Sequence, residues 1–127
     1  MAHMDPLEQA HSATRGPGVV LPMATNKKWF QPSTLRKWLV DGGFQDNKIK
    51  MESVDVWVVM KDLWHWVTIT WSFLGPRADG WKLEDEEKWD QVIETMVEGM
   101  ESSGNCVKGE DGSTKMRFRT NIALAVK

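Results

Sequence analysis

The sequence predicts an α+β domain over residues 29–127, in which a small antiparallel sheet is covered by three helices and completed by dimerisation. Three observations support this fold class. Two segments alternate in hydropathy as strands do, three segments carry apolar residues at helical spacing, and two strands alone do not make a stable sheet. We therefore expect helices to cover the strands and a second copy to extend them, through the tryptophan-rich helices or an exposed sheet edge.

Residues 1–28 precede this domain and show no hydropathy periodicity, with a Gly-Pro-Gly run at 16–18. This composition predicts a disordered or loosely docked arm. The first four residues are typical of a cloning remnant, with Met4 or Met23 as the natural start.

The first half of the domain is predicted to form a helix and a strand. The helix begins after Pro32, where Ser33 can cap it, and it ends at the glycine pair 42–43. The strand covers residues 48–59. Its early half alternates between polar and apolar residues and its later half is apolar on both faces, which indicates a strand that runs from the surface into a covered region.

The second half of the domain is predicted to form two helices and a closing strand. The first helix covers residues 60–74 and is ended by a Gly-Pro pair. The second covers 84–101, with one apolar stripe and an acidic first turn that favours the positive end of the helix dipole. The strand covers 115–126, and its small Ala123 and Ala125 suit a face pressed closely by a helix.

The helix at 60–74 carries the candidate site, because it is apolar on almost every side except one. Lys61, His65, Thr68 and Ser72 follow each other at steps of four, three and four, so they form one narrow polar stripe. A helix with this pattern is buried or lines a pocket. The stripe faces either solvent or a cavity, where it would offer hydrogen bonds within an apolar lining.

Tryptophan is unusually abundant, with eight residues and no tyrosine. Large side chains can simply supply enough core for a small domain, or they can form an aromatic pocket or a self-association face. These two interpretations are compatible with each other. Besides Ser72, the predicted pocket lining consists of Trp57, Trp64, Trp66, Trp71, Trp81 and Trp89.

Three residues of the stripe are candidates for catalysis. His65 is the only histidine outside the arm, and it can act as a general acid or base or can mark the wet edge of its helix. Lys61 and Thr68 could polarise a carbonyl together with it. Separately, Arg117 and Arg119 share one strand face, which either binds an anionic group or is simply exposed.

Composition excludes several classes of protein. The 127 residues carry a net charge of -2, which suits one small domain and lacks the basic excess of a nucleic-acid binder. The single Cys106 excludes an internal disulfide and a Cys-rich zinc site, so we expect a reducing, cytoplasmic compartment. No apolar run is long enough to span a membrane, and the chain starts without a secretory signal.

Two short motifs carry a family resemblance. Leu35-Arg36-Lys37-Trp38-Leu39 stands before Gly42-Gly43-Phe44, and Asn121–Lys127 forms a small-apolar run that ends in a lysine. From Leu35 to Lys127 the chain resembles the C-terminal third of class I S-adenosylmethionine-dependent methyltransferases, particularly fungal ones. The resemblance implies that residues 60–101 form the helical insertion with which this family often contacts substrate.

The sequence lacks the glycine-rich loop and the acidic residue that hold the cofactor in that family, so we expect no cofactor and no methyl transfer by this chain alone. The resemblance then implies a cofactor-independent cyclase or isomerase for an apolar metabolite of secondary metabolism. Its aromatic walls would hold the substrate near its reactive geometry. The alternatives are a non-catalytic binding or partner subunit, and a methyltransferase fragment that needs another chain to bind S-adenosylmethionine.

Overall fold

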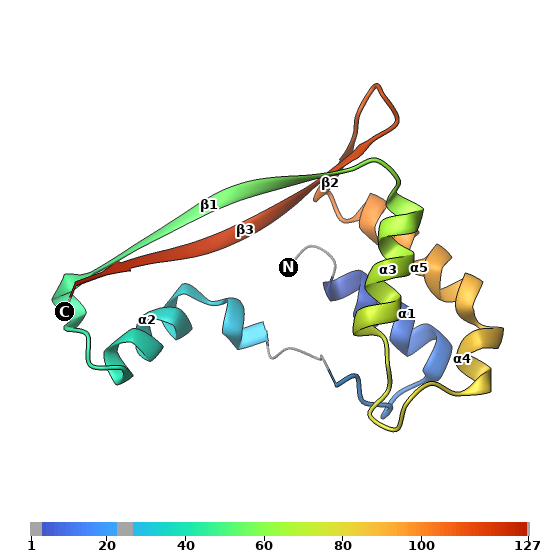
Figure 1. Ribbon diagram of the computed structural model, residues 1–127, viewed down its shortest axis with the longest axis horizontal. Helices are drawn as coiled ribbons and strands as arrows, with labels where there is room; N and C mark the ends of the chain where they lie inside the picture. Colours follow the sequence, from blue (N-terminus) through green and yellow to red (C-terminus); the bar gives the residue numbers. More distant parts are fainter. Residues whose placement is uncertain (1–3, 23–26, 127) are drawn as a thin grey trace. The chain divides into compact units, whose positions relative to one another are not determined.

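The computed structural model describes residues 4–22 and 27–126, which form α-helices, two short 3-10 helices and a small antiparallel sheet (Figure 1). The α+β class is confirmed. The chain divides into two compact units. Unit 1 comprises Met1–Ala24 and Trp57–Arg117, and unit 2 comprises Thr25–Val56 and Phe118–Lys127, so the two long strands contribute to both.

The sheet has the strand order β1-β3-β2. Strand β1 (Ile49–Met60) and strand β3 (Thr114–Ala125) lie within one residue of their predicted bounds. Strand β2 (Cys106–Lys108) was not predicted, because three residues are too few to show an alternating pattern. It pairs with β3, with Val107 opposite Lys115.

The helices of unit 1 pack on one another around α5 (Trp89–Ser102). Helix α3 (Leu63–Leu74) and helix α1 (Met4–Arg15) both contact α5, and the short α4 (Leu83–Glu87) precedes it (Figure 1). The predicted helix at 84–101 is thus divided at Lys88. The buried apolar side chains of this unit include Leu7, Ala10, Val67, Trp71, Val92, Ile93, Met96, Met100 and Met116.

The structure differs from the expectation of a disordered or loosely docked arm at residues 1–28. Residues 4–15 form α1, and the side chains of Leu7 and Ala10 are fully buried. Helix α1 lies close to α5 because Gly99 has no side chain, and a Cβ there would stand 3.2 Å from Pro6 Cβ. The apolar stripe of α1 is too short to stand out in the sequence. Residues 1–3 and 23–26 lie outside the described residues.

Unit 2 contains helix α2 (Pro32–Asp41), the 3-10 helices η1 (Lys27–Phe30) and η2 (Asp46–Lys48), and the remaining parts of β1 and β3. Helix α2 ends at the predicted glycine pair. Arg36 of α2 donates from Nε to Asp46 Oδ1 at 2.7 Å and from Nη1 to the carbonyl oxygen of Ile49, so α2 is fastened to the start of β1. The same guanidinium lowers the pKa of Asp46.

The docking of α1 can be tested by removing one buried side chain. We expect Leu7→Ala to lower the free energy of unfolding by about 2–5 kcal/mol, because the change leaves a cavity between α1 and its neighbours. The measurement is urea unfolding followed by tryptophan fluorescence. Val20→Ala is the control, since Val20 is exposed and its loss should change stability by less than about 0.5 kcal/mol. Equal stabilities of the two variants would mean that α1 is not docked.

Candidate functional site

Helix α3 begins at Leu63, three residues later than predicted, so Lys61 precedes it, and the predicted polar stripe faces solvent. The side chains of Lys61, His65 and Ser72 are exposed, and Thr68 is half-buried. The Thr68 hydroxyl donates to the carbonyl oxygen of Trp64 at 2.9 Å, and the Ser72 hydroxyl donates to that of Thr68 at 2.8 Å. Both hydroxyls thus bind the backbone of their own helix. Of the two alternatives for this stripe, the structure supports the solvated face.

The local fold explains where His65 lies. Asp62 caps the N-terminus of α3, and its Oδ1 accepts the backbone N–H of His65 at 2.9 Å. The cap fixes the first turn, and it directs Leu63 and Val67 into the core of unit 1. The residues on the opposite side of α3, His65 among them, therefore contact water.

The predicted tryptophan pocket is split among several places. Trp71 is fully buried, and its ring centroid lies 6.0 Å from that of Trp81, which lies 5.8 Å from that of Trp89. These three rings form one cluster in unit 1. The other three tryptophans lie in different surroundings: Trp64 is exposed, Trp66 is half-buried and Trp57 lies on β1.

The guanidinium group of Arg15 lies against two of these rings, where the sequence predicted a ligand. Its guanidinium carbon lies 4.6 Å from the centroid of Trp71 and 5.2 Å from that of Trp81. Its Nε donates to Asp85 Oδ1 at 2.5 Å, and its Nη1 donates to the carbonyl oxygen of Gly75 at 2.5 Å. The side chains of Arg15 and Asp85 are only 2% and 1% exposed. The aromatic cluster therefore holds a cation of the chain itself.

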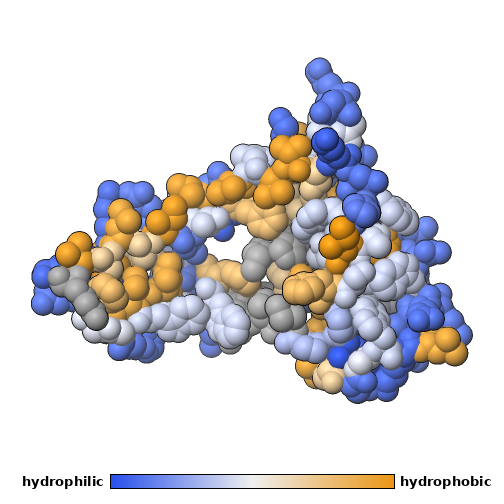
Figure 2. All heavy atoms as spheres, in the orientation of Figure 1, coloured by the Kyte–Doolittle hydropathy of each residue, from blue (hydrophilic) through white to orange (hydrophobic). Residues whose placement is uncertain are grey.

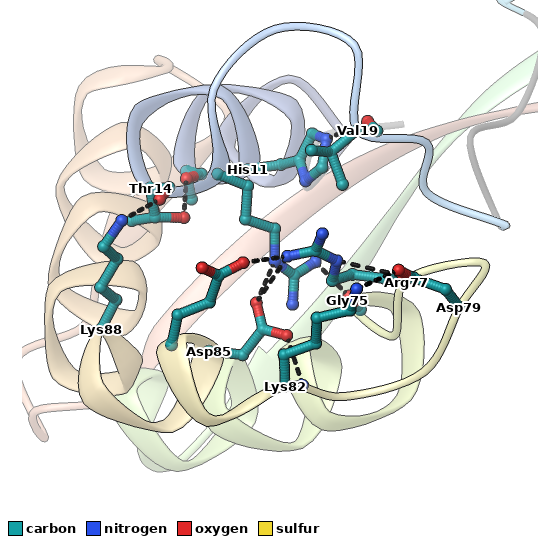
Figure 3. A network of polar contacts seen from close by, with 12 residues as sticks. His11, Thr14, Val19, Gly75, Arg77, Asp79, Lys82, Asp85 and Lys88 are labelled. Atoms are coloured by element: carbon teal, nitrogen blue, oxygen red, sulfur yellow. Dashed lines mark hydrogen bonds and ion pairs between the residues drawn. The ribbon is translucent and has the colours of Figure 1, made fainter.

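Asp85 is tied into a wider polar network (Figure 3). Its Oδ2 accepts the backbone N–H of Lys82 at 2.9 Å, which caps α4. Arg77 pairs with Glu84 and with Asp79, and the hydrogen bond that Arg77 donates to Glu84 raises the pKa of Arg77. These cations and carboxylates pair with one another, so the arrangement stabilises the loop between α3 and α4, although the buried Nη2 of Arg15 makes no hydrogen bond with the described residues.

Sequence reasoning missed Arg15 because its partner lies 70 positions away. The carboxylates of α4 were attributed to the helix dipole, which explains their position but not the burial of Asp85. An arginine within a segment predicted to be disordered gives no signal of its own. Only the docking of α1 brings the two charges together.

A groove lies on the part of the sheet that belongs to unit 1. It has a volume of about 410 Å³ and is lined by Trp57, Val59, Val107 and Lys115. Trp57 and Val59 are two residues apart on β1 and so share a face, while Val107 and Lys115 are paired across β2 and β3. Of the predicted pocket residues, only Trp57 lines this groove, and His65 does not.

A second apolar surface lies on the β1–β3 ribbon of unit 2. Arg119 donates to Asp55 at 2.9 Å and Ser53 donates to Asn121 at 2.8 Å, so these four residues share one face. The residues that alternate with these four along the two strands form the other face. Figure 2 shows apolar side chains exposed along the strands. We call this surface the ribbon face, and its exposed apolar residues are Val54, Val56, Ile122, Leu124 and Val126.

The described residues contain no group of three or more His, Cys, Asp or Glu that could hold a metal ion. Burial and the nearby Glu101 raise the pKa of the Cys106 thiol, which disfavours its thiolate form. Among the described helices, none is long and apolar enough to cross a membrane.

Comparison with known proteins gives no relative. No family model, no curated protein and no solved structure matches this sequence. The resemblance to class I methyltransferases therefore stays a prediction. The chemistry of the surfaces described above is what bears on function.

The role of the Arg15–Asp85 pair can be tested with a double-mutant cycle. We expect Arg15→Leu to lower the free energy of unfolding by about 3–5 kcal/mol, because the buried Asp85 then loses its close partner and keeps Arg77, whose Nη1 lies 3.9 Å away. Arg15→Leu combined with Asp85→Leu should recover much of that loss, since no uncompensated charge remains. Both are measured by urea unfolding.

A matched control for this cycle is the exposed pair of Lys37 and Asp41, one helical turn apart on α2. Its removal should cost no more than about 0.5 kcal/mol. A loss of similar size at both pairs would contradict the burial of Arg15.

Proposed function

We propose that this chain is a non-catalytic binding protein that joins a second copy of itself through the ribbon face. The observation that carries the proposal is the alternating exposure along the end of β3. Ile122, Leu124 and Val126 are 39%, 59% and 66% exposed, whereas Asn121, Ala123 and Ala125 between them are half-buried. The apolar residues thus lie on the open side of the strand.

A two-stranded ribbon is at best marginally stable by itself in water. Such a ribbon needs a further layer against its apolar face to be stable in water. On one face, Asn121 donates from Nδ2 to the carbonyl oxygen of Phe30 in η1 at 2.8 Å, so that face has a partner within unit 2. The ribbon face exposes its valines, isoleucine and leucine instead. Contiguous exposed apolar surface of this kind marks an interaction site.

The charges beside the ribbon face favour a second copy as the occupant. Lys50 and Glu52 lie on the same face of β1 as Val54 and form an ion pair with an N–O distance of 2.7 Å. In a two-fold dimer each surface meets its own copy, so a lysine of one copy can approach the glutamate of the other. An apolar centre beside charges of both signs is complementary to itself. The small net charge of -2 opposes this association only weakly.

The other two hypotheses receive less support from the described residues. A cyclase or isomerase that uses His65, Lys61 and Thr68 requires an apolar enclosure around them, and the stripe that carries them faces solvent. A methyltransferase fragment requires a cofactor loop from another chain. Both stay predictions.

The first experiment measures the oligomeric state by sedimentation velocity from about 1 to 100 µM. We expect the wild-type chain to form a dimer and Leu124→Glu to raise its dissociation constant at least about tenfold, because a carboxylate would be buried in the contact. Leu83→Glu is the matched control, since Leu83 is 72% exposed and lies in unit 1. A wild-type monomer over this range, or equal weakening by both variants, would refute the proposal.

The second experiment tests the self-complementary charges. Lys50→Glu and Glu52→Lys should each weaken the dimer, because each brings like charges together across the two-fold axis. The double variant Lys50→Glu/Glu52→Lys should restore association. Loss of the exposed ion pair within one copy is worth too little to affect folding. Absence of recovery in the double variant would place the contact elsewhere.

A further inference from the structure

We propose that the groove lined by Trp57, Val59, Val107 and Lys115 binds a small amphipathic carboxylate. The apolar body of the ligand would lie on the tryptophan and the two valines, and its carboxylate would meet the lysine ammonium. This site is separate from the ribbon face, because all four residues belong to unit 1. The inference therefore does not depend on the proposed dimer.

The apolar lining is open to water. Trp57, Val59 and Val107 are 47%, 59% and 51% exposed, so each keeps a large part of its side chain in solvent. The volume of about 410 Å³ lies within the range of small-molecule sites. An indole beside two branched aliphatic side chains offers a flat apolar surface on which a chain or ring can lie. Covering such a surface with an apolar ligand is favourable, because it removes apolar surface from water.

Lys115 gives the groove its preference for an anion. Its side chain is exposed, and it forms no ion pair with another described residue. The nearby carboxylate of Asp111 accepts instead from the hydroxyl of Ser113 at 2.6 Å and from its backbone N–H at 3.1 Å. These bonds, with a smaller contribution from Lys115, lower the pKa of Asp111. The ammonium group is thus left to form a charge-assisted hydrogen bond with a ligand.

The two arginines that sequence analysis singled out are engaged elsewhere. Arg119 makes two hydrogen bonds with the carboxylate of Asp55, at 2.9 and 3.3 Å. Arg117 donates from Nη2 to Asn105 at 3.0 Å. Lys115 therefore takes the anion-binding role on this face of β3. Arg117, two positions along the same strand face, adds positive potential beside it.

The experiment compares decanoate with decanol, which has the same chain and no charge, by isothermal titration calorimetry. We expect decanoate to bind saturably and at least about tenfold more tightly than decanol. Lys115→Gln should remove that difference and leave decanol binding unchanged. Trp57→Ala should weaken both ligands, because it removes the aromatic surface. Far-UV circular dichroism and the urea midpoint establish that each variant is folded.

Two controls make the outcome decisive. Lys108→Gln removes another exposed lysine of the same sheet, one that already pairs with Glu101 at 2.9 Å, so it should leave decanoate binding unchanged. The Leu124→Glu variant should bind decanoate as the wild type does, which separates this site from the dimer contact. No saturable binding of decanoate, equal affinities for the two ligands, or equal effects of Lys115→Gln and Lys108→Gln would each overturn the proposal.

Discussion

The burial of Arg15 against Trp71, Trp81 and Asp85 is the interaction on which unit 1 depends. A single guanidinium, carried on α1, contacts the last turn of α3, the loop that follows it and the start of α4. Burying an ion pair has a desolvation cost, so its net contribution to stability is small even when its geometry is good. Its main effect is to favour one way for α1 to dock, since in another position Asp85 would lose its 2.5 Å bond to Arg15 and keep the more distant Arg77, whose Nη1 lies 3.9 Å from Oδ1.

This interaction also decides what the tryptophans do. Trp71 and Trp81 contact the guanidinium, and Trp89 contacts Trp81. The guanidinium and the edge-on and tilted rings thus occupy the place that an aromatic pocket would have needed. The available apolar surface of unit 1 lies instead on the outside, where Trp57 and its neighbours form the groove on the sheet. In this small domain most of the clustered tryptophans pack within the fold. A tryptophan is available for binding only where one face of a strand is exposed to water, as at Trp57.

How far the sequence predicts this molecule depends on the range of the interactions concerned. Strands β1 and β3 were predicted closely because alternation is a local pattern, and α2 because its glycine pair terminates it. The docking of α1 could not be predicted, since it depends on a contact between residues 70 positions apart. The exposure of the predicted polar stripe could not be predicted from the sequence either. Periodicity identifies a helix and its faces, but the packing of α5 decides which face is covered.

Strand β1 shows why apolar residues on both faces do not imply burial on both. Met60 is 4% exposed and Met116 is fully buried, so the helices of unit 1 cover that side of the sheet. Val59, the immediate neighbour of Met60, points the other way and is 59% exposed. A strand with this composition gains little from folding unless something covers its second face. The apolar residues that stay exposed in the folded chain are therefore those whose burial on binding would be favourable. Both the dimer and the ligand groove are proposed at such residues.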